Sequence, residues 1–541
     1  MCGIAGYIGK KNINRTTIIK TLNLMQKRGP DSNGRFFENT KKFNRIFLHT
    51  RLSIIDLNKH SNQPFEDNNF LVIFNGEIYN YIEIRENLIK KGYKFKTNSD
   101  TEVLLKAYIE YKDECVNKFI GMWAFAIFNK SNKNIFLSRD IFGEKPLYYY
   151  YKNNEFIFGS EIKFINSLID KGLKKNFNKI IEFLNFGYKS VNQNNNSFYK
   201  DIKSVEPGCS ILIDKDLNLK KKKFFKINNL NLNPLKKDYK EIVIDVQKLI
   251  LKSLELRLRA DVPLAFCLSG GVDSSFLASL AVKKLNKKIN TFSIIDKDER
   301  YDESKNIKKV VNDLGCENHQ IELSKDQNFF HTLKKLVIQN DGPMSTISYY
   351  VHSFLVNEIS KSGYKVSISG TGADELFTGY YDHYLLYFAS IKNNLLRKRE
   401  INQWNDHCLP LIINDKLKDP FLYIKNPNNT DSVFGIDKDL KILIKKTIKN
   451  KNKQKVFFKK DLLKNRLLNE LFYQVVPSIL KHDDLNSMNF SVENRSPYLD
   501  KELFKYSLMI PTNYLIKDGF QKKVLRDCSK NILLDEVRND R

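Results

Sequence analysis

The chain has 541 residues, 42% of them hydrophobic and 28% charged, which predicts a globular protein of two or more domains. No apolar run approaches the ~18–20 residues of a membrane span, and the start of the chain has no signal-peptide pattern, so we expect a cytoplasmic protein with no membrane partner. The formal charge of +28 comes mainly from dispersed lysines. Because a nucleic-acid site requires a localised basic patch, we expect no nucleic-acid partner. Seven cysteines without CxxC spacing predict free thiols rather than disulfides or zinc ligands.

The first 205 residues predict many strands and a few helices, an α+β pattern. A glycine-punctuated strand is expected over 3–9, and an amphipathic helix over 16–27 ends at the RGPD motif. A polar stretch over 206–238 predicts a linker to a second domain. Further strands are expected at 46–56, 70–74, 123–128, 135–138 and 156–161, with helices at 81–91 and 101–111.

Cys2 follows directly on the initiator Met1. If Met1 is removed, Cys2 combines a nucleophilic thiol with an α-amine whose ordinary pKa, about 7.7–8.0, suits a general base. This is the arrangement of N-terminal nucleophiles. A cysteine at this position is more often incidental than catalytic, so the rest of the chain must supply a substrate site.

Three other positions in this half offer such a site. Arg51 lies inside a β-branched strand, where it either faces solvent or grips a carboxylate with its fork. Asn75 and Gly76 follow a buried strand, and the side-chain amide with the glycine N–H could form an oxyanion hole. Asp100 is expected to cap the helix over 101–111, a role that would explain it without any function.

Together with the RGPD, RLSIID, NGEIYN and SDTE segments, Cys2 resembles the class II glutamine amidotransferase domain. The resemblance implies an N-terminal-nucleophile αββα sandwich in which Cys2 hydrolyses glutamine and Asn75 and Gly76 form the oxyanion hole. It implies that Arg51 holds the glutamine α-carboxylate. By position it assigns glutamine binding to Arg51, Leu52, Ser53, Ile54, Ile55, Asn75, Gly76, Glu77 and Asp100.

From residue 239 onward strands and helices alternate, which predicts an α/β, doubly wound parallel sheet. One strand, 262–268, leads into SGGVDSS and a helix over 276–285, and another, 364–368, leads into SGTGADE. A strand, a glycine-rich turn and a helix together direct backbone N–H groups at phosphate, although a tight turn without a ligand is the alternative. The loops lack GK[ST], so they suit pyrophosphate as a leaving group. The other expected elements are helices at 240–260, 303–314 and 328–338 and strands at 289–295 and 318–323.

Asp273 and Asp374 belong to these two loops. The carboxyl ends of parallel strands share one sheet edge, so we expect the two carboxylates to lie close together and to bind Mg²⁺ with pyrophosphate. Lys522 lies in a KxxLR segment of the predominantly helical end of the chain. A lone lysine is usually solvated, but a positioned one could offset charge on phosphate or on a tetrahedral intermediate.

With SGGVDSS, SGTGADE, ENRSPYLD and KxxLR, nearly the whole chain resembles the glutamine-hydrolysing asparagine synthetase family. The resemblance implies that aspartate reacts with ATP and Mg²⁺ to give an acyl-adenylate and pyrophosphate. Ammonia made at Cys2 would pass through an internal tunnel to this intermediate, with Lys522 as the catalytic cation. By position the resemblance assigns ATP binding to Cys267, Ser269, Gly270, Gly271, Asp273, Ser274, Ile294, Ser369, Gly370 and Asp374.

Two features depart from the family. Thr371 stands where the family has a glutamate near the acceptor and the incoming ammonia, and threonine cannot act as a base there. Another carboxylate, such as a sugar acid of a surface polysaccharide, is therefore an alternative acceptor. The synthetase domain, 239–541, is also expected to lack its C-terminal end, and a non-catalytic or RNA-associated paralogue is a more remote alternative. The sequence leaves the oligomeric state open, a homodimer included.

Overall fold

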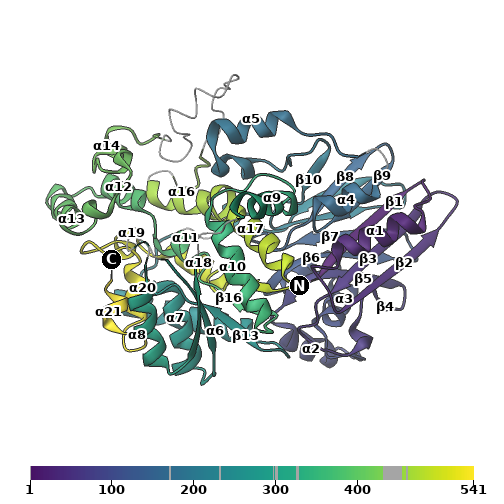
Figure 1. The fold of residues 1–541 in the computed structure, drawn as a ribbon, viewed down its shortest axis with the longest axis horizontal. Helices are drawn as coiled ribbons and strands as arrows, with labels where there is room; N and C mark the ends of the chain where they lie inside the picture. Colours follow the sequence, from purple (N-terminus) through teal and green to yellow (C-terminus); the bar gives the residue numbers. More distant parts are fainter. Residues whose placement is uncertain are drawn as a thin grey trace.

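The computed structural model describes residues 2–169, 172–230, 233–296, 298, 302–323, 328–429, 454–458 and 461–540. Two halves lie side by side, the amino-terminal one in purple and blue and the carboxy-terminal one in teal to yellow (Figure 1). The amino terminus lies where the two halves meet. Met1, whose removal the nucleophile requires, lies outside the described residues.

The amino-terminal half is a sandwich of two six-stranded antiparallel sheets, with orders β10-β8-β9-β1-β3-β2 and β12-β11-β7-β6-β5-β4. Helices α1 (Arg15–Met25) and α4 (Ile162–Leu168) cover the first sheet, and α2 (Tyr81–Lys90) and α3 (Asp100–Tyr111) cover the second. The strands are β1 Gly3–Gly9, β2 Ser32–Asn39, β3 Asn44–Arg51, β4 Phe65–Asp67, β5 Phe70–Ile78, β6 Gly121–Asn129, β7 Ile135–Arg139, β8 Tyr148–Lys152, β9 Glu155–Gly159, β10 Ile202–Ser204, β11 Cys209–Ile213 and β12 Leu219–Lys223.

The alternation of side chains along each strand explains the four layers. In β1, Ile4 faces the other sheet while Ala5 faces α1 and α4. In β5, Ile73 faces the first sheet while Val72 faces α2 and α3. Successive strand residues point to opposite faces, so apolar residues at consecutive positions bury both faces of a sheet. The predicted αββα sandwich is confirmed.

Two local predictions near Cys2 are wrong. Strand β5 does not end at Phe74 but continues through Asn75 and Gly76, because both residues pair with β6. The N-cap of α3 is Ser99, whose hydroxyl accepts from the Thr101 N–H. Asp100 is instead the first helical residue, which frees its carboxylate for another contact.

The segment predicted as a linker, 206–238, contains β11 and β12. Strand β11 pairs with β7 and buries Ile211 and Ile213 in the core of the sandwich. These strands therefore extend the second sheet of the amino-terminal half, although their lysine-rich sequence gives little sign of it.

The carboxy-terminal half is built on a parallel sheet of order β15-β14-β13-β16-β17. In β13, Phe266 faces α6 and α7, and Ala265 faces α10 on the other side. Helices therefore cover both faces, and the predicted doubly wound α/β sheet is confirmed. The strands are β13 Leu264–Cys267, β14 Asn290–Ile295, β15 Glu317–Glu322, β16 Val366–Ile368 and β17 Glu493–Arg495, and the helices α5 Phe177–Phe186, α6 Tyr239–Arg257, α7 Val272–Lys283, α8 Ser304–Leu314, α9 Phe329–Gln339, α10 Ser348–Lys361 and α11 Ala373–Phe377 belong to or border this half.

Helix α7 begins at Val272, four residues before the predicted start, because Gly271 caps it. Asp273 and Ser274 therefore lie in the first helical turn rather than in a preceding loop. Strand β17 was not predicted, since three residues from the ENRSPYLD segment carry no strand signal of their own.

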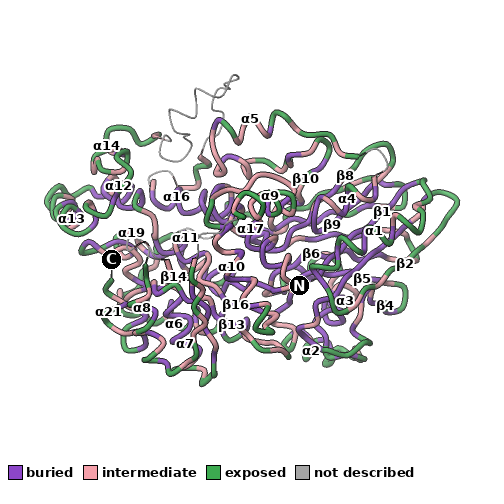
Figure 2. The backbone as a smooth tube through the Cα atoms, viewed as in Figure 1, coloured by how far each residue is buried: buried purple, intermediate pink, exposed green. Residues whose placement is uncertain are grey.

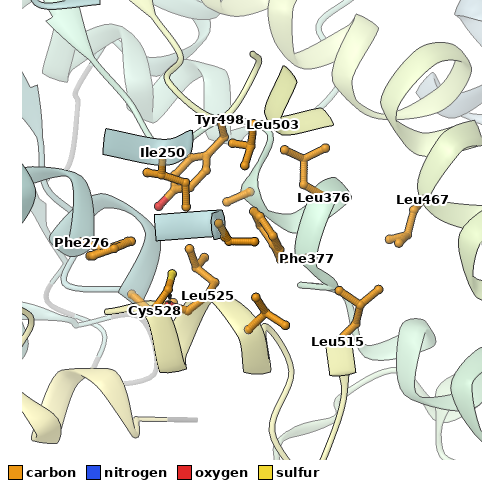
Figure 3. Packing of buried hydrophobic residues seen from close by; sticks show 14 of the residues in the cluster. Ile250, Phe276, Leu376, Phe377, Leu467, Tyr498, Leu503, Leu515, Leu525 and Cys528 are labelled. Atoms are coloured by element: carbon orange, nitrogen blue, oxygen red, sulfur yellow. Dashed lines mark hydrogen bonds between the residues drawn. The ribbon is translucent and has the colours of Figure 1, made fainter. Parts of the chain in front are cut away.

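Helices dominate the end of the chain and share one large apolar core with α6 and α7. Figure 3 shows Ile250, Phe276, Tyr498 and Leu503 converging in this core. Figure 2 shows the same buried interior continuing from the sheets into this region. The helices are α12 Tyr381–Ser390, α13 Asn394–His407, α14 Leu422–Lys425, α16 Leu462–Asn469, a π-helical turn Glu470–Gln474, α17 Val476–Asn489, α18 Lys501–Met509, α19 Thr512–Leu515, α20 Lys523–Cys528 and α21 Asp535–Arg538. Among the described helices, none is both long and apolar enough to cross a membrane.

An aromatic cluster joins the two halves. Phe142, just after β7, stacks on Phe472 at 5.8 Å and meets Phe504 edge-on at 5.8 Å. Phe142, Phe472 and Phe504 are all buried. Aromatic pairs in these geometries stabilise a core beyond the area that they bury.

We expect Phe142→Ala to lower the free energy of unfolding by about 3–5 kcal/mol, because it leaves a cavity between the halves. Urea denaturation followed by tryptophan fluorescence would measure the shift. The matched control is Phe177→Ala on α5, where the side chain is 64% exposed and the loss should stay below about 0.5 kcal/mol. Equal shifts in the two variants would contradict the packing role.

Candidate active sites

Cys2 lies at the entrance to β1 and is buried. Its backbone nitrogen, which is the α-amine once Met1 is removed, donates to Asn75 Oδ1 at 3.1 Å. Within the described residues the buried Asn75 Nδ2 has no hydrogen-bond partner, so it is available as a donor. Gly76 has φ +145°, and a Cβ there would lie 2.0 Å from the Met122 carbonyl oxygen. Only glycine lets β5 approach β6 this closely while Asn75 points toward Cys2.

A small cavity of about 20 Å³ lies beside Cys2. It brings together most of the predicted glutamine-binding residues. Ser53 and Asn75 are not among its lining residues, and the Ser53 N–H donates instead to Asp31 Oδ2. The lining comprises Cys2, Arg51, Leu52, Ile54, Ile55, Gln63, Phe74, Gly76, Glu77, Ser99, Asp100 and Thr101, of which Gln63, Phe74, Ser99 and Thr101 were not predicted.

The Arg51 guanidinium shapes the loop over this cavity. Its Nη1 donates to the Asn58 carbonyl and to Asn62 Oδ1, each at 2.9 Å, and its Nη2 donates to the Ile55 and Asp56 carbonyls. A rigid fork with several donors can hold a loop and still present positive charge to a carboxylate.

Burial sets the protonation of the groups around Cys2. It raises the pKa of the Cys2 thiol, and the charge of the amino terminus opposes the rise. Burial raises the pKa of the Asp100 carboxyl to about 6, against the hydrogen bond from the Ile78 N–H. Burial and the neighbouring Glu493 raise the pKa of Glu77 well above its ordinary value.

Arg28 connects this cavity to the other half of the molecule. Its Nε donates to the Cys2 carbonyl at 3.0 Å, and its Nη1 donates to Glu161 at 2.9 Å and to Asp484 at 2.7 Å. Asp484 lies on α17, and the Arg28, Glu161 and Asp484 side chains are all buried. The RGPD motif contains Arg28, but nothing in the sequence links it to a residue 456 positions away.

A second buried contact crosses the interface at Glu77. Arg495 on β17 lies 3.5 Å from the Glu77 carboxylate and 2.7 Å from Glu493. Its Nη1 also donates to the carbonyls of Arg257 and Arg259, each at 2.8 Å. Glu77, one of the predicted glutamine-binding residues, is therefore held in part by the carboxy-terminal half.

The first glycine-rich loop is a tight turn into α7. The Ser269 N–H donates to Ser274 Oγ at 3.1 Å, and Gly270 takes φ +78°, where a side chain would be strained. A cavity of about 770 Å³ lies over this loop and the SGTGADE loop. Of the predicted ATP-binding residues, Gly270 and Gly271 lie outside its lining, and those within it are Cys267, Ser269, Asp273, Ser274, Ile294, Ser369, Gly370 and Asp374.

Lys522 bridges the two loops. Its Nζ lies 2.6 Å from Asp273 Oδ2 and 2.6 Å from Asp374 Oδ1, so the expected closeness of the two carboxylates is seen. Burial disfavours the Lys522 cation, but the two carboxylates raise its pKa above the ordinary value. Asp273 Oδ1 is buried and has no hydrogen-bond partner among the described residues. An unpaired carboxylate oxygen beside a phosphate-type loop fits a divalent cation.

Comparison with known proteins agrees with both halves. Residues 1–225 match the family model of a glutamine amidotransferase domain, and residues 245–541 match that of asparagine synthase. An amidotransferase sandwich joined to such a synthetase sheet defines a glutamine-hydrolysing ligase. The chain belongs to the glutamine-hydrolysing asparagine synthetase family.

Three relatives illustrate the range of similarity. The chain is 32% identical to asparagine synthetase [glutamine-hydrolyzing] 1 of Bacillus subtilis, covering 100% of this chain and 86% of the relative. It is 34% identical to a putative asparagine synthetase [glutamine-hydrolyzing] 2 of Methanocaldococcus jannaschii, covering 71% and 76%. It is 27% identical to the amidase chry2 of Gibberella zeae, covering 70% and 59%.

We expect Arg28→Lys to lower the free energy of unfolding by about 3 kcal/mol, because a point charge leaves buried carboxylates poorly paired. The matched control is Arg259→Lys. Arg259 also reaches a carboxylate across the interface, but its partner Glu83 is half exposed, so the loss should be about 0.2–1 kcal/mol. Denaturant titration of both variants makes the comparison, and a larger loss in Arg259→Lys would contradict it.

Proposed function

We propose that the protein makes asparagine from aspartate, ATP and glutamine, releasing glutamate, AMP and pyrophosphate. The observation that carries the proposal is the pairing of two sites through buried contacts. Arg28 donates to the carbonyl of Cys2, which lines the smaller cavity, and to Asp484 on α17, while the adjacent α17 residue Asp483 lines the larger cavity. We further propose that residues 1–205, extended by β11 and β12, form the glutaminase and residues 239–541 the synthetase.

In the proposed glutaminase, the Cys2 thiol attacks the glutamine side-chain amide and its α-amine takes the thiol proton. The Asn75 amide and the Gly76 N–H stabilise the resulting oxyanion. Ammonia leaves, and water hydrolyses the thioester to glutamate. The Arg51 fork binds the substrate's α-carboxylate, Glu77 and Asp100 bind its α-amine, and the Leu52–Ile55 backbone lines the pocket.

In the proposed synthetase, the aspartate β-carboxylate attacks the α-phosphorus of ATP and pyrophosphate leaves. Asp273 and Asp374 are the residues that would hold Mg²⁺, which would neutralise charge on the pyrophosphate. Lys522 stabilises charge on the phosphates, and ammonia from Cys2 then displaces AMP through an internal route. We assign ATP binding to Cys267, Ser269, Gly270, Gly271, Asp273, Ser274, Ile294, Ser369, Gly370 and Asp374.

Thr371 favours one alternative, the same chemistry on another carboxylate. Its hydroxyl lies in the 770 Å³ cavity between two glycines, where it offers a hydrogen bond but no charge. The family also includes a relative named as an amidase. The alternative acceptor is another carboxylate, for example a sugar acid.

We expect Cys2→Ala to abolish glutamate release while ammonia-dependent amide formation continues near the wild-type rate. Glutamate release is measured without acceptor, and amide formation with ammonium chloride. Cys115→Ala is the matched control. It removes a buried free thiol that lines neither cavity, so both activities should remain unchanged. Glutamine hydrolysis by Cys2→Ala would overturn the nucleophile assignment.

Pyrophosphate release in the presence of ammonia, measured on the same preparation with each candidate carboxylate, identifies the acceptor. We expect aspartate to support release, with asparagine as the product. Release with a sugar acid and not with aspartate would replace the first proposal by the second.

Glutamine capture should weaken in acid. The pKa of Asp100 lies near 6 rather than near 4, so its carboxylate is charged at pH 7.5 and is neutralised as the pH falls below about 6. Because kcat/KM reports free-enzyme ionisations, glutaminase kcat/KM should show a further acidic limb near pH 6, below the limb set by the Cys2 α-amine. We expect Asp100→Asn to lower this constant about tenfold at pH 7.5 and to remove the limb near pH 6, whereas Asp113→Asn, whose side chain is 45% exposed and lies outside the cavity lining, should keep it. An unchanged limb in Asp100→Asn would contradict the assignment.

A further inference from the structure

The larger cavity contains a carboxylate that none of these steps uses. Asp483 lies on α17, is 8% exposed and lines the 770 Å³ cavity together with the SGTGADE loop. The Thr371 hydroxyl hydrogen-bonds to it. His352 on α10 lines the same cavity, and its Nδ1 lies 4.0 Å from Asp483 Oδ1. That distance is too long for a hydrogen bond between the two side chains, so each of them can still bind a third group.

Three other carboxylates that line the cavity are engaged in contacts of their own. Asp273 and Asp374 share Lys522, and Glu375 accepts from the Tyr380 hydroxyl at 2.5 Å. His352 Nδ1 is buried and has no hydrogen-bond partner within the described chain. Asp483 and His352 therefore form a polar pair separate from the phosphate-type loops.

Helix α17 also connects Asp483 to the source of ammonia. The next residue, Asp484, binds Arg28, and Arg28 in turn binds the Cys2 carbonyl. Consecutive residues of α17 thus line the larger cavity and bind Arg28 of the amino-terminal half, so Asp483 adjoins the contact between the two halves.

We propose that Asp483 is the general base of amide formation, an assignment that rests on the proposed function. Ammonia attacks the acyl carbon of the adenylate, the C–N bond forms, and the C–O bond to AMP breaks, with the electron pair leaving on AMP. One proton of the attacking nitrogen passes to the Asp483 carboxylate. From Asp483 the proton passes to water in the cavity, which His352 also lines.

The surroundings of Asp483 suit this role. Burial raises the pKa of its carboxyl, and His352, the Thr371 hydroxyl and Lys145 oppose the rise while Asp484 adds to it. A carboxylate with a raised pKa is a stronger base for the proton of an ammonium-like intermediate. The charged and titratable groups facing Asp483 are His352 and Tyr349 on α10, Lys145 after β7, Cys267 at the end of β13, and Asp484.

The test compares Asp483→Asn with Asp483→Glu. In Asp483→Asn, ammonia-dependent amide formation should fall about 100-fold and lose its acidic pH limb. Acceptor-dependent exchange of labelled pyrophosphate into ATP, and glutamine hydrolysis, should remain at wild-type rates. Asp483→Glu should recover most of the amide formation, which shows that the fold tolerates change at this position.

Two outcomes would overturn the proposal: unchanged amide formation in Asp483→Asn, or a parallel loss of pyrophosphate exchange, which would make Asp483 an acceptor-binding or structural residue. The acceptor used is whichever carboxylate supports exchange in the wild-type protein. If aspartate is not the acceptor, the wild-type protein shows no pyrophosphate exchange with aspartate. If Asp483 is not the base, the failure is seen only in the Asp483 variants.

Discussion

The guanidinium of Arg28, buried between the two halves, ties the residue at the start of β1 to a helix of the carboxy-terminal half. A buried charge without partners costs several kcal/mol, so Arg28 requires Glu161 from its own half and Asp484 from the other at the same time. The Nε of Arg28 donates to the Cys2 carbonyl. The position of Cys2, the proposed nucleophile, is thus fixed partly by α17 of the carboxy-terminal half.

The second interface contact, between Glu77 and Arg495, makes the cavity beside Cys2 depend on the carboxy-terminal half as well. Glu77 lines the cavity beside Cys2, yet its carboxylate faces Arg495 on the edge strand of the parallel sheet. Apolar packing around these charges keeps them in a medium of low effective dielectric, where paired charges interact strongly. Leu52 and Ile55 from the cavity loop pack with Val366 and Met488 from the other half.

Local sequence could predict those parts of the sites that lie within one element. The Gly-rich loops and the strand before Asn75 follow from short segments, and the closeness of Asp273 to Asp374 follows from the rule that parallel strands share one carboxyl edge. Contacts set by tertiary packing could not be predicted this way. Strand β5 continues past Asn75 only because β6 lies beside it, and Asp484 reaches Arg28 across 456 residues. The lysine-rich β12 is a strand because β11 offers an edge for pairing, not because of its own propensity.

The Lys522 bridge shows how the fold maintains a geometry that local preferences oppose. Lys522 has φ +55°, and Thr378, a β-branched residue, has φ +73°, a genuine departure from ordinary backbone. Thr378 Oγ1 accepts from the Lys522 N–H at 3.3 Å, so the two unusual residues support each other. At Gly379 a Cβ would lie 1.4 Å from Asp374 Oδ1, so only glycine leaves room for that carboxylate to face Lys522. Strain of order 1–3 kcal/mol per residue persists only where the surroundings enforce it, and here the enforced feature is the cation held between two carboxylates.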